Sequence, residues 1–197
     1  MNKRLEKQLK FIIEIDRVKS IIRKTKIFHQ NRCENDAEHS WHISLMAIIL
    51  CEYSNEPIDI LKVIKMLLIH DLVEIDVGDI IVYKKSSENV INEKKAAERI
   101  FGLLPPDQNK EFLKLWLEFE KCNTIEAKFA TALDRTEPVM QNTHHNCDTW
   151  NSHKITYNQV ININTKISNG SKALWDYLKK EIDKCYNNGL FKTENSV

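Results

Sequence analysis

Residues 61–75 read LKVIKMLLIHDLVEI, a strongly apolar segment. A helix with this sequence is apolar on nearly every face, so we expect it to lie in the core. Glycine commonly stops a helix, which predicts an end near Val77 and Gly78. His70 and Asp71 fall in the middle of this helix. Buried polar groups are costly without partners, so the pair needs something that offsets its desolvation.

The pair His70 and Asp71 has two interpretations. Hydrogen-bonded polar pairs occur in ordinary protein cores, so the dipeptide alone is weak evidence for a metal site. Two other segments favour a metal: AEHSWH places His39 near the start of a helix, and TALDRTEP places Asp134 inside an apolar helical stretch. Two imidazoles with two carboxylates form a mixed nitrogen and oxygen site. Such a site suits a divalent ion, with Mn²⁺, Co²⁺, Fe²⁺, Zn²⁺ and Mg²⁺ as candidates.

The composition predicts a single all-α domain over residues 1–197. The chain has only 4 Gly and 4 Pro, too few turn residues for many short strands. Its 29 Lys+Arg balance 28 Asp+Glu, so no overall charge field favours nucleic acid or an anionic membrane surface. The apolar periodicity predicts helices over 4–22, 36–53, 61–77, 86–101, 105–121, 124–142, 156–167 and 171–187, with loops over 26–36 and 144–156.

The cysteines and the hydropathy pattern predict a cytoplasmic protein. Five cysteines without a Cys-x-x-Cys motif suggest neither a disulfide framework nor a thiolate zinc site. The N-terminal segment mixes charges with its apolar residues, unlike a signal peptide. No segment reaches the roughly 18 apolar residues that a membrane-spanning helix needs.

Two acidic residues follow the His-Asp pair. Glu74 lies one helical turn after His70, a position from which it would orient water beside a bound ion. Asp79 follows the stop at Gly78 and would protonate a leaving alkoxide. The alternative is structural: Glu74 would be a solvated acid at a helix end, and Asp79 a cap for the next segment.

Several segments together resemble one known family, the HD-domain hydrolases close to the 5′-deoxynucleotidases of bacteria and eukaryotes. The similar segments cover nearly the whole chain: RCENDAEHSWHISLMA, VIKMLLIHDLVEIDVGD, ERIFGLLP, LDRTEPVMQN and SNGSKALWDYLK. The resemblance implies a compact helical bundle, a homodimer, and removal of phosphate from deoxynucleoside 5′-monophosphates. It implies metal ligands at His39, His70, Asp71 and Asp134, and a catalytic acidic pair at Glu74 and Asp79.

The resemblance also implies a phosphate-binding arginine before the first ligand. Arg23 is the candidate, although its spacing to His39 differs from that of the deoxynucleotidases by about one residue, which leaves Lys24 as a rival. Arg32 and Arg135 are further candidates because a guanidinium presents a planar fork of donors. Arg135 ranks below Arg32 because a helical neighbour points about 100° away from the preceding ligand.

The pocket rim and the remaining histidines are less specific. Trp41 is our candidate for contact with a nucleoside, since aromatic rings supply a large apolar surface. His42 is expected to support the site from outside the metal shell. The segment 143–154 departs from the family pattern, and the spacing of its His and Cys residues fits no structural zinc motif.

The sequence therefore predicts a metal-dependent phosphohydrolase of small phosphorylated substrates, foremost (deoxy)nucleoside 5′-monophosphates. One alternative is an HD enzyme acting on a nucleoside triphosphate or a signalling nucleotide. The other is a non-catalytic protein that binds the metal and senses nucleotides. The presence of both acidic candidates, Glu74 and Asp79, favours an enzyme over a sensor.

Overall fold

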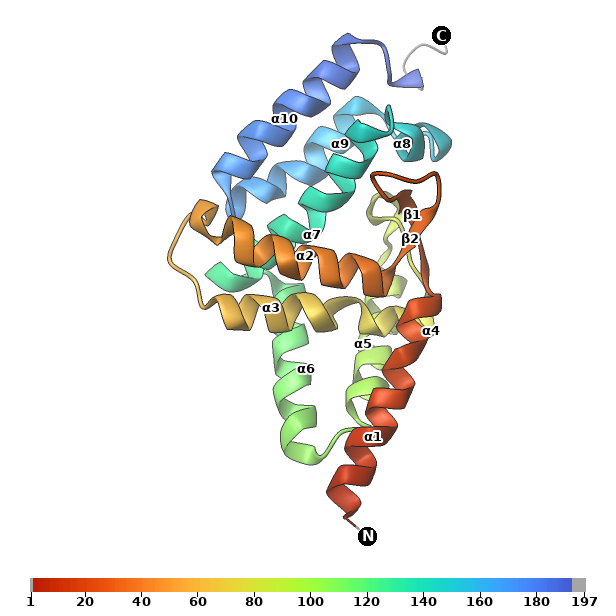
Figure 1. The fold of residues 1–197 in the computed structure, drawn as a ribbon, viewed down its shortest axis with the longest axis vertical. Helices are drawn as coiled ribbons and strands as arrows, with labels where there is room; N and C mark the ends of the chain where they lie inside the picture. The colour runs from red at the N-terminus through yellow and green to blue at the C-terminus, as the bar shows by residue number, and fades with distance from the viewer. Residues whose placement is uncertain (1, 193–197) are drawn as a thin grey trace.

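Three helices form the centre of the computed structural model, which describes residues 2–192. Helices α2 (Asp36–Leu50) and α3 (Ile60–Ile69) lie side by side across the middle of the molecule, and α7 (Ile125–His144) packs against both (Figure 1). Their contact buries apolar side chains, among them Ile43 and Phe129. The prediction of a helical fold is confirmed.

The remaining helices extend this centre in two directions (Figure 1). One group packs around a second apolar cluster, and its helices are α1 (Lys3–Ile15), α4 (Glu74–Val77), α5 (Ser87–Phe101) and α6 (Pro106–Lys121). The other group packs with the end of α7 around a third cluster, and its helices are α8 (Asp148–Ser152), α9 (Tyr157–Asn164) and α10 (Lys172–Asn187). Short 3₁₀ helices connect them: η1 (Asp16–Ser20), η2 (Cys51–Tyr53), η3 (His70–Val73), η4 (Val82–Lys84) and η5 (Thr165–Asn169). None of the helices within 2–192 is both long and apolar enough to cross a membrane.

The predicted helix over 4–22 is too long. Helix α1 ends at Ile15, and after η1 the chain forms strand β1 (Ile22–Lys26), which pairs antiparallel with β2 (Cys33–Asn35). The predicted loop over 26–36 therefore contains a strand. Pairing with β2 satisfies backbone groups that a longer helix would have bonded internally.

The start of α2 fixes the position of His39. Asn35 caps the helix: its side chain accepts the backbone N–H of Glu38 at 3.0 Å, and the Glu38 carboxylate accepts the N–H of Asn35 at 3.0 Å. This capping box anchors the first turn of α2. His39 lies within that turn, directly beneath the β1–β2 hairpin.

The apolar helix predicted over 61–77 is broken at the His-Asp pair. Helix α3 ends at Ile69, and η3 carries His70 and Asp71 before α4 begins. Trp116 of α6 donates its indole N–H to the carbonyl of His70 at 3.1 Å. In an uninterrupted α-helix this carbonyl would accept a backbone N–H of the next turn instead. The predicted stop is confirmed, since Gly78 follows α4 with φ of 74°. The predicted loop over 144–156 contains the short helix α8.

Candidate metal centre and active site

The imidazole of His70 is held in a single orientation. Its Nδ1 donates to the carbonyl of Leu67 at 2.9 Å, which leaves the lone pair on Nε2. That Nε2 lies 3.1 Å from Oδ2 of Asp71 and 3.4 Å from Oδ1 of Asp134. It is buried and makes no hydrogen bond to any described residue. Burial lowers the pKa of His70, but the charges of Asp71 and Asp134 raise it well above its usual range, so this nitrogen takes up a proton in the metal-free protein and marks a place for positive charge.

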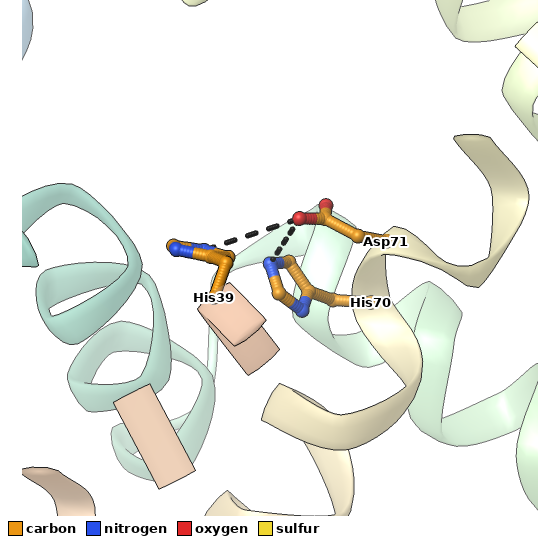
Figure 2. A group of neighbouring side chains, drawn as sticks. All are labelled: His39, His70 and Asp71. Atoms are coloured by element: carbon orange, nitrogen blue, oxygen red, sulfur yellow. Dashed lines mark ion pairs between the residues drawn. The ribbon is translucent and has the colours of Figure 1, made fainter. Parts of the chain in front are cut away.

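His39 approaches the same point from helix α2 and is fully buried. Its Nδ1 lies 3.2 Å from Oε2 of Glu137, and its Nε2 lies 3.2 Å from Oδ1 of Asp134 and 3.9 Å from Oδ2 of Asp71. A carboxylate on Nδ1 favours the tautomer that leaves Nε2 free to ligate. Figure 2 shows the two rings converging on one Asp71 oxygen.

The four donor atoms match the dimensions of a metal site. Donors bound about 2.0–2.2 Å from one ion lie roughly 3–4 Å from one another, and the four separations between an imidazole and a carboxylate here run from 3.1 to 3.9 Å. Among the described residues, His39, His70 and Asp71 form one of three groups whose donor atoms lie mutually within 4.8 Å. These three residues fit a divalent ion. Asp134 lies outside that group, but its Oδ1 is 3.2 and 3.4 Å from the two Nε2 atoms, which makes it the candidate for a fourth ligand.

The pKa of His39 shows how strongly this place attracts positive charge. Burial lowers this pKa, and the charge of Arg23 lowers it further. Hydrogen bonds to Asp134 and Glu137 outweigh both effects, and the pKa rises to about 9. The carboxylates thus stabilise the protonated His39 ring when no ion is bound. The same negative charges would favour a bound cation over a neutral molecule at this position.

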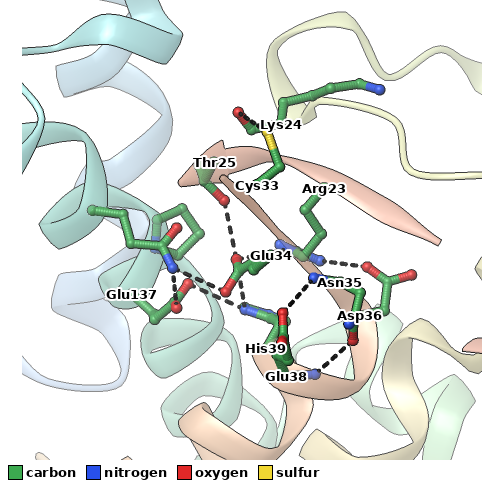
Figure 3. A network of polar contacts seen from close by, with 12 residues as sticks. Arg23, Lys24, Thr25, Cys33, Glu34, Asn35, Asp36, Glu38, His39 and Glu137 are labelled. Carbon is green, nitrogen blue, oxygen red and sulfur yellow. Dashed lines mark hydrogen bonds and ion pairs between the residues drawn. The ribbon is translucent and has the colours of Figure 1, made fainter. Parts of the chain in front are cut away.

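Three buried carboxylates beside the ligands were missed in the sequence (Figure 3). Glu137 lies between His39 and His42, whose Nδ1 atoms are each 3.2 Å from its carboxylate oxygens. Glu34, on β2, accepts from Thr25 at 3.0 Å. Asp36 is fully buried at the start of α2. A signal existed for Glu137 alone, because it lies three positions after Asp134 on one helix, which places both on the same face.

Arg23 lies inside the site, on strand β1. Its Nη1 is 2.7 Å from Oδ2 of Asp71 and 3.4 Å from Oδ1 of Asp36, and its Nε is 3.2 Å from Oε1 of Glu34. The guanidinium is largely buried among these carboxylates. Lys24 is exposed and extends away from them (Figure 3). Of the two rivals, only Arg23 contacts a metal-ligand candidate.

Glu74 and Asp79 both face the cavity beside the metal centre. Burial, followed by repulsion from Asp71 and Asp36, raises the pKa of Glu74 to about 12. Burial also raises the pKa of Asp79, while the charge of Arg23 lowers it. Each carboxylate has one buried oxygen without a hydrogen-bond partner among the described residues. Glu74 is thus no solvated helix-end acid.

A comparison with family models matches residues 15–175 to the HD domain. The chain belongs to the HD domain family. The resemblance seen in the sequence is therefore confirmed, and the His-Asp pair of η3 lies within the matched region.

Solved and curated relatives agree with this assignment. The crystal structure of a predicted metal-dependent phosphohydrolase from Magnetospirillum magnetotacticum superimposes with a TM-score of 0.89 at 44% identity, covering 95% of this chain and 97% of that one. The human 5′-deoxynucleotidase HDDC2 is 29% identical over 140 residues, which are 68% of this chain and 65% of the human protein. Its zebrafish counterpart is 30% identical over 140 residues, 70% of this chain and 68% of that protein. The chain thus spans about two thirds of the length of these curated relatives.

The HD domain holds a cavity of about 310 Å³ that begins at the metal centre. This volume is at the lower end of the range for small-molecule sites. His70, Asp71 and Asp134 form part of its wall. Residues from other segments complete the lining, including Val82, Tyr83, Arg135, Val139, Trp150 and Asn164.

Two predicted substrate contacts do not reach this cavity of the HD domain. Arg32 is about half exposed and forms a bidentate pair with Glu38, at 2.7 and 2.8 Å. Trp41 is 65% exposed, and its ring stacks on that of His42. Both lie outside the cavity lining. Arg135, which we placed below Arg32 as a phosphate-binding candidate, is part of the lining.

Proposed function

We propose that this HD domain is a single-domain, metal-dependent phosphohydrolase that removes phosphate from (deoxy)nucleoside 5′-monophosphates or similar small phosphomonoesters. The observation that carries the proposal is the convergence of four metal donors and two acidic side chains on one cavity. The names of the relatives, 5′-deoxynucleotidase and predicted metal-dependent phosphohydrolase, support the same reaction.

His39, His70, Asp71 and Asp134 are the residues that would hold the ion. Their mixture of imidazole and carboxylate donors fits Mn²⁺, Co²⁺, Fe²⁺, Zn²⁺ or Mg²⁺. An ion of this kind polarises a phosphoryl oxygen and lowers the pKa of water. Its double positive charge also offsets the carboxylates, so that an anionic phosphate can approach them.

The side chains of this protein position the substrate and move protons. Arg23 orients Asp71 and adds positive charge beside the phosphate. Glu74 orients the attacking water and accepts its proton. Its pKa is raised first by burial and then by repulsion from Asp71 and Asp36, and a cation near Asp71 would offset both effects by favouring the ionised carboxylate. Asp79 delivers a proton to the leaving alkoxide. The oxygens of both acids that lack partners are available for these contacts.

The proposal includes a homodimer in the cytoplasm. Helix α2 exposes large apolar side chains, a feature of protein interfaces: Trp41, Leu45, Ile48 and Ile49. All five cysteines are free thiols, which suits a reducing compartment. Light scattering on the purified protein tests the dimer, and a monomer mass at micromolar concentration would contradict it.

A phosphate-release screen tests the proposed reaction. Metal-free protein is loaded with each of the five candidate ions and given deoxynucleoside 5′-monophosphates, ribonucleotides, nucleoside triphosphates and a phosphodiester. We expect phosphate from monophosphates, and none after a chelator is added. Turnover restricted to triphosphates or diesters, or no turnover with any ion, would contradict the proposal.

A further inference from the structure

Arg135 presents two buried guanidinium nitrogens that have no hydrogen-bond partner among the described residues. It follows Asp134 on α7 and lines the same cavity. Its Nε and Nη1 are buried and make no hydrogen bond in the part of the chain that the structure describes. Desolvating a charged group without compensation is costly, so an unpaired guanidinium in a cavity wall indicates that an acceptor binds there.

Two other cations of the cavity wall, Arg23 and Lys85, are already paired with carboxylates. Arg23 contacts Asp71 at 2.7 Å. Lys85 contacts Glu93 at 2.7 Å and Glu120 at 3.8 Å. Nε and Nη1 of Arg135 have no hydrogen-bond partner within residues 2–192, so these two donors are free to meet a ligand.

Tyr83 supplies a second donor at the same end of the cavity. Its phenol oxygen accepts from Nδ2 of Asn164 at 3.1 Å. Burial raises the pKa of Tyr83, and the charge of Arg135 is near enough to oppose this. With its oxygen accepting from Asn164, the hydroxyl proton has no acceptor among the described residues and is free to donate into the cavity.

This donor pair lies toward the helices that follow α7. Tyr83 packs on the apolar cluster that includes Trp150 and Val160, whereas the ligands His70 and Asp71 come from η3 at the centre of the molecule. A substrate whose phosphate sits on the metal would therefore direct its leaving group toward Arg135. There Arg135 and Tyr83 offer donors to the oxygen atoms of that group.

We infer that Arg135 and Tyr83 form a specificity subsite that binds oxygen acceptors on the leaving group of the substrate. The inference rests on the proposed function for the direction of the substrate. A guanidinium pairs bidentately with two acceptors in one plane, such as the carbonyl oxygen and ring nitrogen of guanine. A second phosphate on the sugar would satisfy the same donors. Adenine has no carbonyl oxygen, so adenosine nucleotides with one phosphate are the weaker ligands.

Binding measurements on the metal-loaded protein distinguish the two possible acceptors, a base carbonyl and a second phosphate, without requiring turnover. Calorimetry compares deoxyguanosine 5′-monophosphate, deoxyadenosine 5′-monophosphate, deoxyadenosine 3′,5′-bisphosphate and inorganic phosphate. Tighter binding of the guanine ligand than of its adenine counterpart assigns the subsite to base carbonyls. Tighter binding of the bisphosphate assigns it to a second phosphate. Equal affinities for the three nucleotides would overturn the inference, whether or not the protein is a phosphohydrolase.

The variant Arg135→Gln tests the residue itself. We expect a loss of about 10- to 100-fold in affinity for the preferred nucleotide, as for a lost charge-assisted contact, and no change for inorganic phosphate. Arg135→Lys keeps the charge without the fork and should recover only part of the loss. The matched control is Arg17→Gln, an exposed arginine paired with Glu14.

Thermal unfolding distinguishes this role from a structural one. Removing an unpaired buried charge should leave the Tm of the Arg135→Gln protein unchanged or raised. A lowered Tm, or an equal loss of affinity for nucleotide and for inorganic phosphate, would overturn the inference. Tyr83→Phe should reproduce part of the nucleotide effect with the same selectivity.

Discussion

Nη1 of Arg23 lies 2.7 Å from Oδ2 of Asp71, and that same oxygen lies 3.1 Å from Nε2 of His70. The arginine therefore orients the carboxylate that faces the two imidazoles. The sequence suggested a contact of Arg23 with phosphate alone. The structure couples Arg23 to the metal centre as well, because movement of the Asp71 carboxylate changes the donor set.

Replacing Arg23 by methionine should thus weaken metal binding along with turnover. Loss of a group that orients a ligand typically costs about 10- to 100-fold in metal affinity or activity. Competition with a chelator measures the affinity, and Arg17→Met, on the surface, is the control. An unchanged metal affinity together with lost turnover would restrict Arg23 to the substrate.

Glu74→Gln should retain the metal and lose turnover. The side chain lies beside the donors but is proposed to act on water, and loss of a general acid or base typically costs about 10²–10⁴ in rate. Elemental analysis and kcat are measured on the same preparation, with exposed Glu88→Gln as the control. A kcat within a few-fold of wild type would remove Glu74 from the mechanism.

Glu137→Gln tests the support behind the first ligand. Glu137 contacts Nδ1 of both His39 and His42 at 3.2 Å, so its loss should release the ring of His39. We expect metal affinity to fall by about 10- to 100-fold. The experiment is a titration with Mn²⁺ or Co²⁺, in which His42→Ala should have a smaller effect. Equal effects of the two substitutions would show that Glu137 does not act through His39.

The effect of metal on stability should grow with pH. The pKa of His39 rises from 6.5 to about 9 when the metal-free chain folds, so its protonated ring stabilises the fold below about pH 6.5. That contribution is lost as the pH rises through 9. Metal requires the neutral ring, so its affinity increases over the same interval. Calorimetry with and without Mn²⁺ should give a Tm difference that widens from pH 6.5 to 9, and a constant or shrinking difference would contradict this assignment.

The helical core could be predicted because its signals are local. The apolar segment around His70 and the stop at Gly78 follow from periodicity and from glycine's conformational freedom. The end of α1 was missed because its apolar stripe continues through Ile21 and Ile22. Strand β1 depends on pairing with β2, which contacts it only after a loop, and a periodicity argument contains no such information.

The part of the site that lies in recognisable sequence motifs could be predicted. The four ligand candidates come from such motifs and converge in space, although Asp134 lies 95 positions after His39. Glu34 and Asp36 gave no signal because single acids near a helix start are ordinary caps. The free guanidinium of Arg135 could not be foreseen, since which arginines find carboxylate partners is decided by tertiary packing.

Metal stoichiometry in ligand variants tests the central claim most directly. Elemental analysis of protein loaded with Mn²⁺ or Co²⁺ and then desalted should find one ion per chain in the wild type and in the surface control Asp176→Ala. Asp71→Ala should bind almost none and be inactive, because it leaves two imidazoles and a single carboxylate, and Asp134→Ala should behave alike. Metal content equal to that of the wild type in either ligand variant would contradict the assignment of this centre.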